Sequence, residues 1–282
     1  MCKAIHISDL HGDTKKYGKL FDYIRLELPD IVLIGGDLYP SYKNLQKSNQ
    51  NFLTEYLIPN FEVLKDELNE NYPLICMILG NDDPATEEDE IKNAAHQGLW
   101  HYINQNKIKY KEYTIYGYSY IPPTPFLNKD WELYDVSRYV DPGCTHPTEG
   151  IRSINPGRDI EFATIKKDLE NLIVDDDLSK TIFLFHSPPY STNLDRAALD
   201  DKFVDHIPLD VHVGSIAIKE FIELRKPMLT LHGHIHESTT ITGSWKEKIG
   251  ASHCFNAATE LNLLSVIEFE LKNLSNAKRK LY

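Results

Sequence analysis

Three histidines stand at alternate positions in His232-Gly233-His234-Ile235-His236, directly after the apolar run 227–231. The run predicts a buried strand, and glycine lets the chain turn sharply as it leaves a sheet. Imidazole rings at such a strand exit are well placed to bind a metal ion, although histidines also cluster at protein surfaces. This segment therefore indicates a candidate metal site.

Four further segments follow the same pattern, in which an apolar run ends at once in Asp, His or Asn, often beside a glycine. Five strand ends then deliver seven candidate metal ligands: Asp9, His11, Asp37, Asn81, His186, His234 and His236. In open α/β sheets, ligands bind outside the carboxyl ends of the strands, so all seven side chains can converge on one crevice. The alternative is that five unrelated strand ends happen to be polar.

The types of donor atom narrow the choice of metal. Carboxylate, imidazole and amide groups suit divalent first-row ions such as Mn, Fe, Co or Zn. Seven ligands exceed what one tetrahedral site needs. They match two ions of octahedral type that share a carboxylate, with water at the open positions.

The ordered set of strand ends resembles the five signature blocks of the calcineurin-like metallophosphoesterases. The blocks lie between positions 9 and 236 and read Asp9-Leu-His11, Gly36-Asp37, Gly80-Asn81, His186 and Gly233-His234-Ile-His236. The resemblance implies that Asp9, His11 and His236 hold a first metal, that Asn81, His186 and His234 hold a second, and that Asp37 bridges them. It also implies an α/β fold in which two mixed β-sheets pack as a central sandwich flanked by α-helices, in four layers.

The third block departs from the family pattern, which usually reads Gly-Asn-His followed by Asp or Glu. Here Asp82 stands where that histidine belongs, within Gly80-Asn81-Asp82-Asp83. In the family the histidine contacts the substrate phosphate and helps to protonate the leaving oxygen. Beside two dications Asp82 is expected to stay ionised, which makes it a poor acid that repels a phosphate oxygen. Alternatively, Asp82 is a loop carboxylate that holds a turn.

A second region with possible chemistry precedes a predicted helix over 216–225, for which Ser215 is the natural N-cap. A helix N-terminus near the crevice could accept a phosphate oxygen. His212 lies just before it and could reach the substrate, or it could have a purely structural role. His232 is expected to support the metal site from behind by a hydrogen bond to a ligand.

The elements that must position these side chains alternate between strand and helix, as expected for one α/β domain of 282 residues. Helices are expected near 14–28, 46–69 (broken or kinked at Pro59), 87–104 and 159–173, and strands near 3–8, 31–35, 74–79, 110–121, 181–185, 238–242, 252–256 and 263–271. The polar tail 272–282 is expected to fray. The aromatic and proline-rich segment 121–157 is expected to be an ordered insertion, lying either over the mouth of the site or against an outer helix.

Composition limits the partners. The formal net charge of −12 disfavours loose binding to nucleic acid, but it allows a small phosphorylated substrate because bound metal ions can dominate the local field. The apolar runs are too short to span a bilayer, and no long apolar segment of a secretory signal follows the first residues. Four scattered cysteines are expected to be reduced thiols, which favours the cytoplasm.

These observations predict an enzyme that hydrolyses phosphoesters, as a phosphatase or a phosphodiesterase, with a hydroxide activated by two metal ions. One alternative is an interaction scaffold that keeps this fold with weak or absent catalysis. The full set of seven candidate ligands favours the enzyme, because a scaffold is expected to lose ligands. A nuclease acting on nucleic-acid phosphodiesters would use the same chemistry, but the acidic composition disfavours it.

Overall fold

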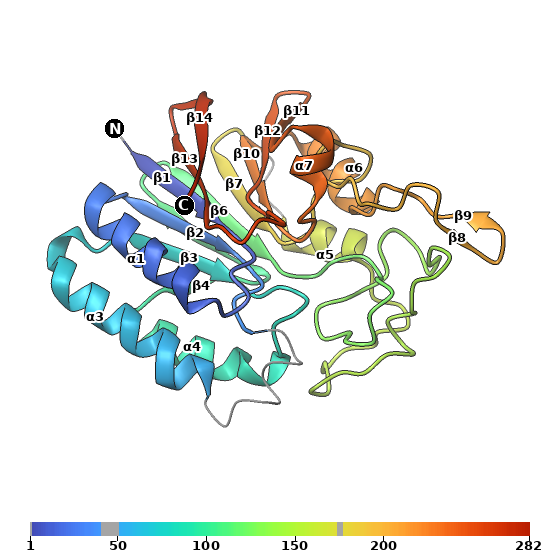
Figure 1. Ribbon diagram of the computed structural model, residues 1–282, viewed down its shortest axis with the longest axis horizontal. Helices are drawn as coiled ribbons and strands as arrows, with labels where there is room; N and C mark the ends of the chain where they lie inside the picture. Colours follow the sequence, from blue (N-terminus) through green and yellow to red (C-terminus); the bar gives the residue numbers. More distant parts are fainter. Residues whose placement is uncertain (1, 41–50, 174–176) are drawn as a thin grey trace.

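Two mixed six-stranded sheets face one another in the computed structural model, which describes residues 2–40, 51–173 and 177–282 (Figure 1). From edge to edge, the first sheet contains β14 (Asn273–Leu281), β13 (Ser265–Glu270), β1 (Lys3–Ile7), β2 (Ile31–Gly35), β3 (Leu74–Ile78) and β4 (His101–Tyr102). Strands β1 to β4 are mutually parallel, and β13 and β14 add an antiparallel pair. The carboxyl ends of β1, β2 and β3 therefore lie at the same edge of the sheet.

The second sheet has a similar arrangement, with a parallel centre and antiparallel edges. Its order is β11 (Lys246–Ile249), β12 (Ser252–Asn256), β10 (Leu229–His232), β7 (Thr181–Phe185), β6 (Tyr113–Tyr118) and β5 (Asn106–Tyr110). Strands β12, β10, β7 and β6 are parallel, so β7 and β10 also end at a common edge. A separate two-stranded hairpin joins β8 (Phe203–Val204) to β9 (Ile207–Pro208).

The alternation of side chains along the central strands places one hydrophobic layer between the sheets and another outside them. On β2, Ile31 and Leu33 belong to the layer between the sheets. Val32 and Ile34 of the same strand point to the opposite face, which packs under helices. A strand buried on both faces explains the continuous apolar runs in the sequence.

Helices cover the outer faces of the two sheets, with α1, α3 and α4 on one side and α5 and α6 on the other (Figure 1). Their bounds are α1 (Thr14–Glu27), α3 (Ile58–Leu68), α4 (Glu88–His96), α5 (Ile165–Leu172), α6 (Ile216–Arg225) and α7 (Ser238–Thr242), with short turns η1 (Leu53–Leu57), η2 (Asn69–Asn71) and η3 (Ala85–Glu87). The expected fold of two sheets flanked by helices is confirmed. No helix in the described ranges is long and apolar enough to cross a membrane.

Helix α1 shows how local sequence sets these elements. The Asp13 side chain caps its first turn by accepting the backbone N–H groups of Lys15 and Lys16. Its apolar residues recur at helical spacing and are buried against the sheet. Leu28 then ends the helix in a left-handed conformation, directly before Pro29.

Several expected elements differ from the structure. The helix expected over 87–104 ends at His96, and β4 follows at His101. The strand expected over 238–242 is the short helix α7, and the tail expected to fray forms the longest strand, β14. The expected strand 110–121 is shorter, as β6, and is preceded by the unexpected β5. Of the helix expected from 46, residues 46–50 lie outside the described residues, and a π-helical turn precedes α3 with Pro59 in its first turn.

The segment 121–157 contains no helix or named strand and is held by isolated bridges, such as Ile121 to Glu132 and Asn128 to Ile151. Its interior holds an ion pair between Lys129 and Glu132, 2.5 Å apart, both of whose side chains are fully buried. Thr124 donates two further hydrogen bonds to the Glu132 carboxylate. These contacts tie the parts of the segment together in its interior.

Candidate metal centre

Six of the seven side chains expected at the strand ends converge in two groups that share one carboxylate. The first group contains Asp9, His11, Asp37 and His236, and the second contains Asp37, His186 and His234. Within each group, one ligand atom of each residue lies within 4.8 Å of those of the others. Asp37 belongs to both groups, as a bridging carboxylate must.

In the first group, two imidazoles and two carboxylates face the same small volume. Nε2 of His236 lies 3.2 Å from Oδ1 of Asp9 and 3.2 Å from Nε2 of His11. The same His11 nitrogen lies 3.8 Å from Oδ2 of Asp37. These donor atoms come from the ends of β1, β2 and β10, so the sheet edges hold them together.

The second group brings Asn81 to the site. Nε2 of His186 lies 3.0 Å from Oδ1 of Asn81 and 3.4 Å from Oδ2 of Asp37. The other ring nitrogen of His186 lies 2.7 Å from the Gly35 carbonyl oxygen, to which it can donate. Such a bond fixes the orientation of the ring and leaves Nε2 to face the other ligands.

Four of the candidate ligands have a strained backbone conformation. The φ angles of Asp9, His11, Asp37 and His234 are 59°, 47°, 53° and 70°, in the left-handed region that non-glycine residues rarely adopt. Strained conformations persist where the surrounding structure imposes them, and they cluster at functional sites. Four of the seven candidate ligands thus carry local strain that places their side chains at the crevice.

Two glycines permit the close approach of the strand ends. A Cβ atom on Gly80 would lie 2.3 Å from Oδ1 of Asp37, and one on Gly233 would lie 2.6 Å from Oδ2 of Asp9. Neither position leaves room for any other residue. The glycines beside the candidate ligands are therefore required by packing around the carboxylates.

We expect Gly80→Ala to lower the phosphoester hydrolysis predicted from the sequence by about 100-fold, because displacement of a reacting group by about 1 Å can have an effect of that size. The new methyl group would displace Asp37 or the ring of His186, whose Cε1 lies 2.7 Å from the ideal Cβ position. Steady-state kinetics would measure the loss. Gly18→Ala is the matched control, since nothing lies within 4 Å of its Cβ position and activity should not change. Equal activity of both variants would contradict this packing.

The buried carboxylates and imidazoles of the site shift one another's pKa values. Burial disfavours a charged His186 ring, but the carboxylates of Asp37 and Asp9 raise its pKa to about 10. Burial also disfavours an ionised Asp37, yet nearby His186 and His11 lower its pKa to about 2. His234 differs, because burial and the charge of His186 lower its pKa to about 3. Two buried carboxylates thus attract positive charge into the crevice, and this set of oxygen and imidazole donors fits a pair of divalent cations.

Asp82 lies at the edge of the site. Its backbone N–H donates to Oδ1 of Asp37 at 2.9 Å, and its carboxylate Oδ2 lies 3.6 Å from Nδ1 of His11. Its side chain is 39% exposed. Among the described residues, no backbone N–H donates to this carboxylate, so the structure does not support the alternative of a turn-holding aspartate.

The neighbouring Asp83, which sequence reasoning did not single out, holds the turn instead. Its fully buried carboxylate accepts the backbone N–H groups of Leu38, Tyr39 and Gly80 at 2.7 to 2.8 Å. It therefore joins the loops after β2 and β3, which carry Asp37 and Asn81. The only signal in the sequence is a second acidic residue after Asn81, which does not distinguish a buried carboxylate from an exposed one.

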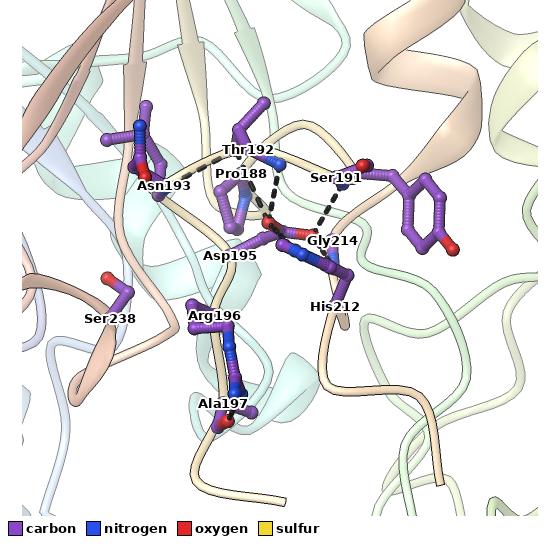
Figure 2. Close-up of polar contacts among 12 residues, drawn as sticks. Pro188, Ser191, Thr192, Asn193, Asp195, Arg196, Ala197, His212, Gly214 and Ser238 are labelled. Atoms are coloured by element: carbon purple, nitrogen blue, oxygen red, sulfur yellow. Dashed lines mark hydrogen bonds and ion pairs between the residues drawn. The ribbon is translucent and has the colours of Figure 1, made fainter. Parts of the chain in front are cut away.

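His212 is held by a buried aspartate (Figure 2). Its Nδ1 lies 2.8 Å from Oδ1 of Asp195, whose side chain is fully buried while that of His212 is 30% exposed. Asp195 also accepts the backbone N–H groups of Ser191, Thr192 and Gly214 at 2.9 to 3.1 Å. Nδ1 of His212 thus faces a carboxylate with a fixed position, and its orientation is set by the loop after β7.

The N-terminus of α6, where a phosphate oxygen could have been accepted, is occupied by an aspartate of the chain itself. Ser215 caps the helix as predicted, by accepting the N–H of Ile218. The Asp135 carboxylate, however, accepts the N–H groups of Ile216 and Ala217 and the Ser215 hydroxyl, at 2.6 to 3.3 Å. The backbone N–H groups at this helix terminus are therefore already bound to the Asp135 carboxylate.

His232 does not make the hydrogen bond to a candidate ligand that the sequence predicts. Nδ1 of His232 lies 2.8 Å from the carbonyl oxygen of Ser187, beside His186, and its Nε2 lies 2.7 Å from the Thr230 hydroxyl. His232 thus contacts the backbone next to a candidate ligand rather than a ligand side chain. His6, which carried no expectation of a role, lies 2.9 Å from the His232 carbonyl oxygen and links the two sheets.

Comparisons with solved structures show the fold. A Thermus thermophilus protein of 16% sequence identity superposes with a TM-score of 0.58, over 99% of this chain and 98% of its own. A dimetal phosphatase from Danio rerio, at 10% identity, superposes with a TM-score of 0.52 over 94% and 92% of the two chains. No curated protein matches the chain in sequence.

The family is shown by a different comparison. The family model of the calcineurin-like phosphoesterases matches residues 2–238, which include every candidate ligand. Because this match covers most of the chain, the protein belongs to the calcineurin-like phosphoesterase family.

Proposed function

We propose that the chain is a hydrolase that cleaves phosphoesters with two divalent metal ions held by the seven converging side chains. Asp9, His11 and His236 would hold one ion, and Asn81, His186 and His234 the other, with Asp37 shared. The observation that carries this proposal is the presence of Asp37 in both ligand groups. The proposal treats residues 1–282 as a single domain, with 121–157 as an insertion whose Asp135 carboxylate caps α6.

The bound ions would supply Lewis acidity toward the phosphoryl oxygens and lower the pKa of water so that it is nucleophilic near neutral pH. The residues of the chain position and balance this charge. The Gly35 carbonyl orients His186, and Asp83 fixes the two loops that carry Asp37 and Asn81. Rigid placement of this kind accounts for much of the rate in phosphoryl transfer.

Two residues are proposed to act on the substrate itself. Asp82 would face the phosphate at the partly exposed edge of the site, without providing a strong acid. His212 is one candidate for the acid that protonates the leaving oxygen, beside solvent water, and the bond between its Nδ1 and the buried Asp195 supports that role. A buried carboxylate that accepts the imidazole N–H fixes the tautomer and stabilises the protonated ring.

The substrate class follows from charge. A small phosphorylated molecule, whether a phosphomonoester or a small phosphodiester, fits an acidic chain of net charge −12 better than a nucleic acid does. The cytoplasm remains the proposed compartment, because the four cysteines of the chain are free thiols in the structure.

Metal analysis combined with a substrate panel tests the proposal. We expect about two divalent ions per chain, loss of phosphoesterase activity on chelation, and recovery when Mn²⁺, Fe²⁺, Co²⁺ or Zn²⁺ is added back. The panel should contain phosphomonoesters, phosphodiesters, nucleotides and single-stranded RNA. Full activity in the chelated protein would overturn the proposed function, and a preference for RNA would favour the nuclease.

The affinity for metal should rise with pH. The folded pKa of His186, about 10, lies above its ordinary value of 6.5, so the stabilising contact of its charged ring with Asp37 is complete below pH 6.5 and is lost as the pH rises through 10. An imidazole must lose its extra proton before it can bind a metal ion, so binding expels this proton. We expect affinity to rise by roughly tenfold per pH unit for each proton released. Calorimetry in buffers of different ionisation enthalpy would count the protons, and an affinity independent of pH would contradict the assignment of His186.

A further inference from the structure

A cavity of about 490 Å³ lies between α4 and the proline-rich segment, and none of the seven candidate metal ligands lines it. One wall is formed by Ala85, four residues after Asn81, and by Trp131. The Trp131 indole N–H donates to the Asp83 carbonyl oxygen at 2.8 Å, and Ala85 donates to the Asp130 carboxylate at 2.9 Å. The volume of the cavity falls within the range of about 300–1,000 Å³ that small-molecule sites occupy.

Three aromatic side chains lie among the residues that line the cavity. Trp131 and Tyr120 also line the cavity, with their ring centroids 5.5 Å apart. Tyr102 lines it as well, and its hydroxyl donates to the Glu88 carboxylate at 2.8 Å. Rings fixed in this way offer flat apolar surfaces against which a planar group can pack.

Three cationic side chains, Lys92, Arg152 and Arg158, also line the cavity. Two of them face carboxylates: Arg158 forms two hydrogen bonds to Asp168, at 2.6 and 2.9 Å, and Lys92 lies 2.9 Å from Glu88.

Arg152 differs, because its guanidinium donates only to the carbonyl oxygens of Asp130, Glu132 and Pro147, at 2.9 to 3.4 Å. Among the residues that the structure describes, no carboxylate lies within 4.0 Å of it.

The carboxylates nearest to Arg152 are committed elsewhere. That of Asp130 accepts the N–H and hydroxyl groups of Ser153, each at 2.6 Å, besides the N–H of Ala85. That of Glu132 is bound to Lys129. A guanidinium that borders a cavity without a carboxylate partner is suited to bind an oxyanion.

We propose that this cavity is a second binding site, separate from the metal centre, for a small organic anion in which a planar ring carries a phosphate, phosphonate or carboxylate group. The oxyanion would lie toward Arg152, with Lys92 at the exposed side, and the ring would pack against Trp131 and Tyr120. Because the wall of the cavity is continuous with the loop of Asn81 and Asp82, the bound anion would contact the structure that positions a candidate metal ligand.

Phenylphosphonate, which carries no hydrolysable ester bond, is a suitable probe. Titrated into the full chain with its metals bound, it should change the fluorescence of Trp131 to a saturable limit, and Trp131→Phe should abolish that change. Arg152→Gln and Lys92→Glu should each weaken binding by about 10-fold or more, through loss or reversal of a nearby charge. Lys19→Glu on α1, which does not line the cavity, makes the same charge change and should have no effect. Benzyl alcohol, which has the ring without the charge, should not bind at the same concentrations.

The metal-centre variant Asp37→Ala separates this site from the catalytic one, because it should retain the binding of phenylphosphonate. Absence of saturable binding would overturn the proposal. So would binding that is lost in Asp37→Ala but unchanged in the cavity variants, since the probe would then occupy the metal centre. If Arg152→Gln loosens the segment that its guanidinium holds together, Lys92→Glu decides, because that side chain is 45% exposed and belongs to α4 rather than to this segment.

Discussion

Replacing Asp37 with alanine is expected to lower kcat/KM for phosphoester hydrolysis by about 1000-fold or more, because stabilisation of transition-state charge by metal ions is worth several kcal/mol. Asp37 is the one side chain present in both ligand groups, so its loss should weaken both proposed metal positions at once. His236→Ala removes a ligand from the first group alone and should also abolish most activity. Kinetics with excess metal, together with metal analysis, would measure both effects.

The fold should survive both substitutions, since the hydrophobic layers lie along the strands and not at their ends. Circular dichroism and thermal unfolding would verify this. Asp22→Ala is the matched control, because that carboxylate is 81% exposed on α1 and pairs only with Arg25 at the surface. Retention of most activity by Asp37→Ala, with metal in excess, would exclude the assigned site.

The identity of the leaving group is expected to affect the rate strongly if Asp82 occupies the position of the usual histidine and no other acid acts. Esters of p-nitrophenol, which departs without a proton, should then be hydrolysed about 10²–10⁴-fold faster than alkyl esters, the usual contribution of general acid catalysis. Asp82→His should narrow that gap, because an imidazole provides a proton and removes a negative charge beside the phosphate. The carboxylate lies only 3.6 Å from His11, so the new ring would remain at the edge of the site.

A native rate that varies little with leaving-group pKa would instead identify His212 as the acid. In that case His212→Ala should create the steep dependence, and Asp195→Asn should reproduce part of it by changing the tautomer that Nδ1 adopts. Asp82→His would then have little effect. A series of aryl and alkyl phosphates measured with all four proteins distinguishes these outcomes.

The convergence of the candidate ligands could be predicted because its signals in the sequence are local. An apolar run, a glycine and a polar residue in direct succession define the end of a buried parallel strand, as in Ile34-Gly35-Gly36-Asp37. Parallel strands bring their carboxyl ends to one edge, so the pattern implies that the side chains meet. The convergence of the seven expected ligands follows from this rule and needs no knowledge of loops.

Strand β14 and helix α7 could not be predicted in this way. Strand β14 carries many lysines and asparagines and pairs because β13 presents an open edge to it. In α7, the β-branched residues of Ser238–Thr242 favour a strand. The segment is a helix instead: the Ser238 hydroxyl donates to the Ile235 carbonyl oxygen at its start, and Gly243 ends it in a left-handed conformation.

The buried carboxylates form a second group that sequence reasoning cannot identify. Asp83, Asp135 and Asp195 each accept backbone N–H groups from loops distant in sequence or at a turn. In the sequence they resemble the exposed aspartates that surround them. Only the fold reveals that these three hold the loops around the candidate site.

The order of strands within the two sheets also bears on self-association. Both sheets are open, and an exposed strand edge can pair with the edge of another molecule. Of the four edge strands that the structure describes, β4 is only two residues long. The other three carry paired lysines: Lys107 and Lys109 on β5, Lys246 and Lys248 on β11, and Lys278 and Lys280 on β14. Two copies that approach edge to edge would therefore bring lysines close to lysines. Although the net charge of the chain is −12, positive charge at the sheet edges thus opposes edge-to-edge pairing between molecules.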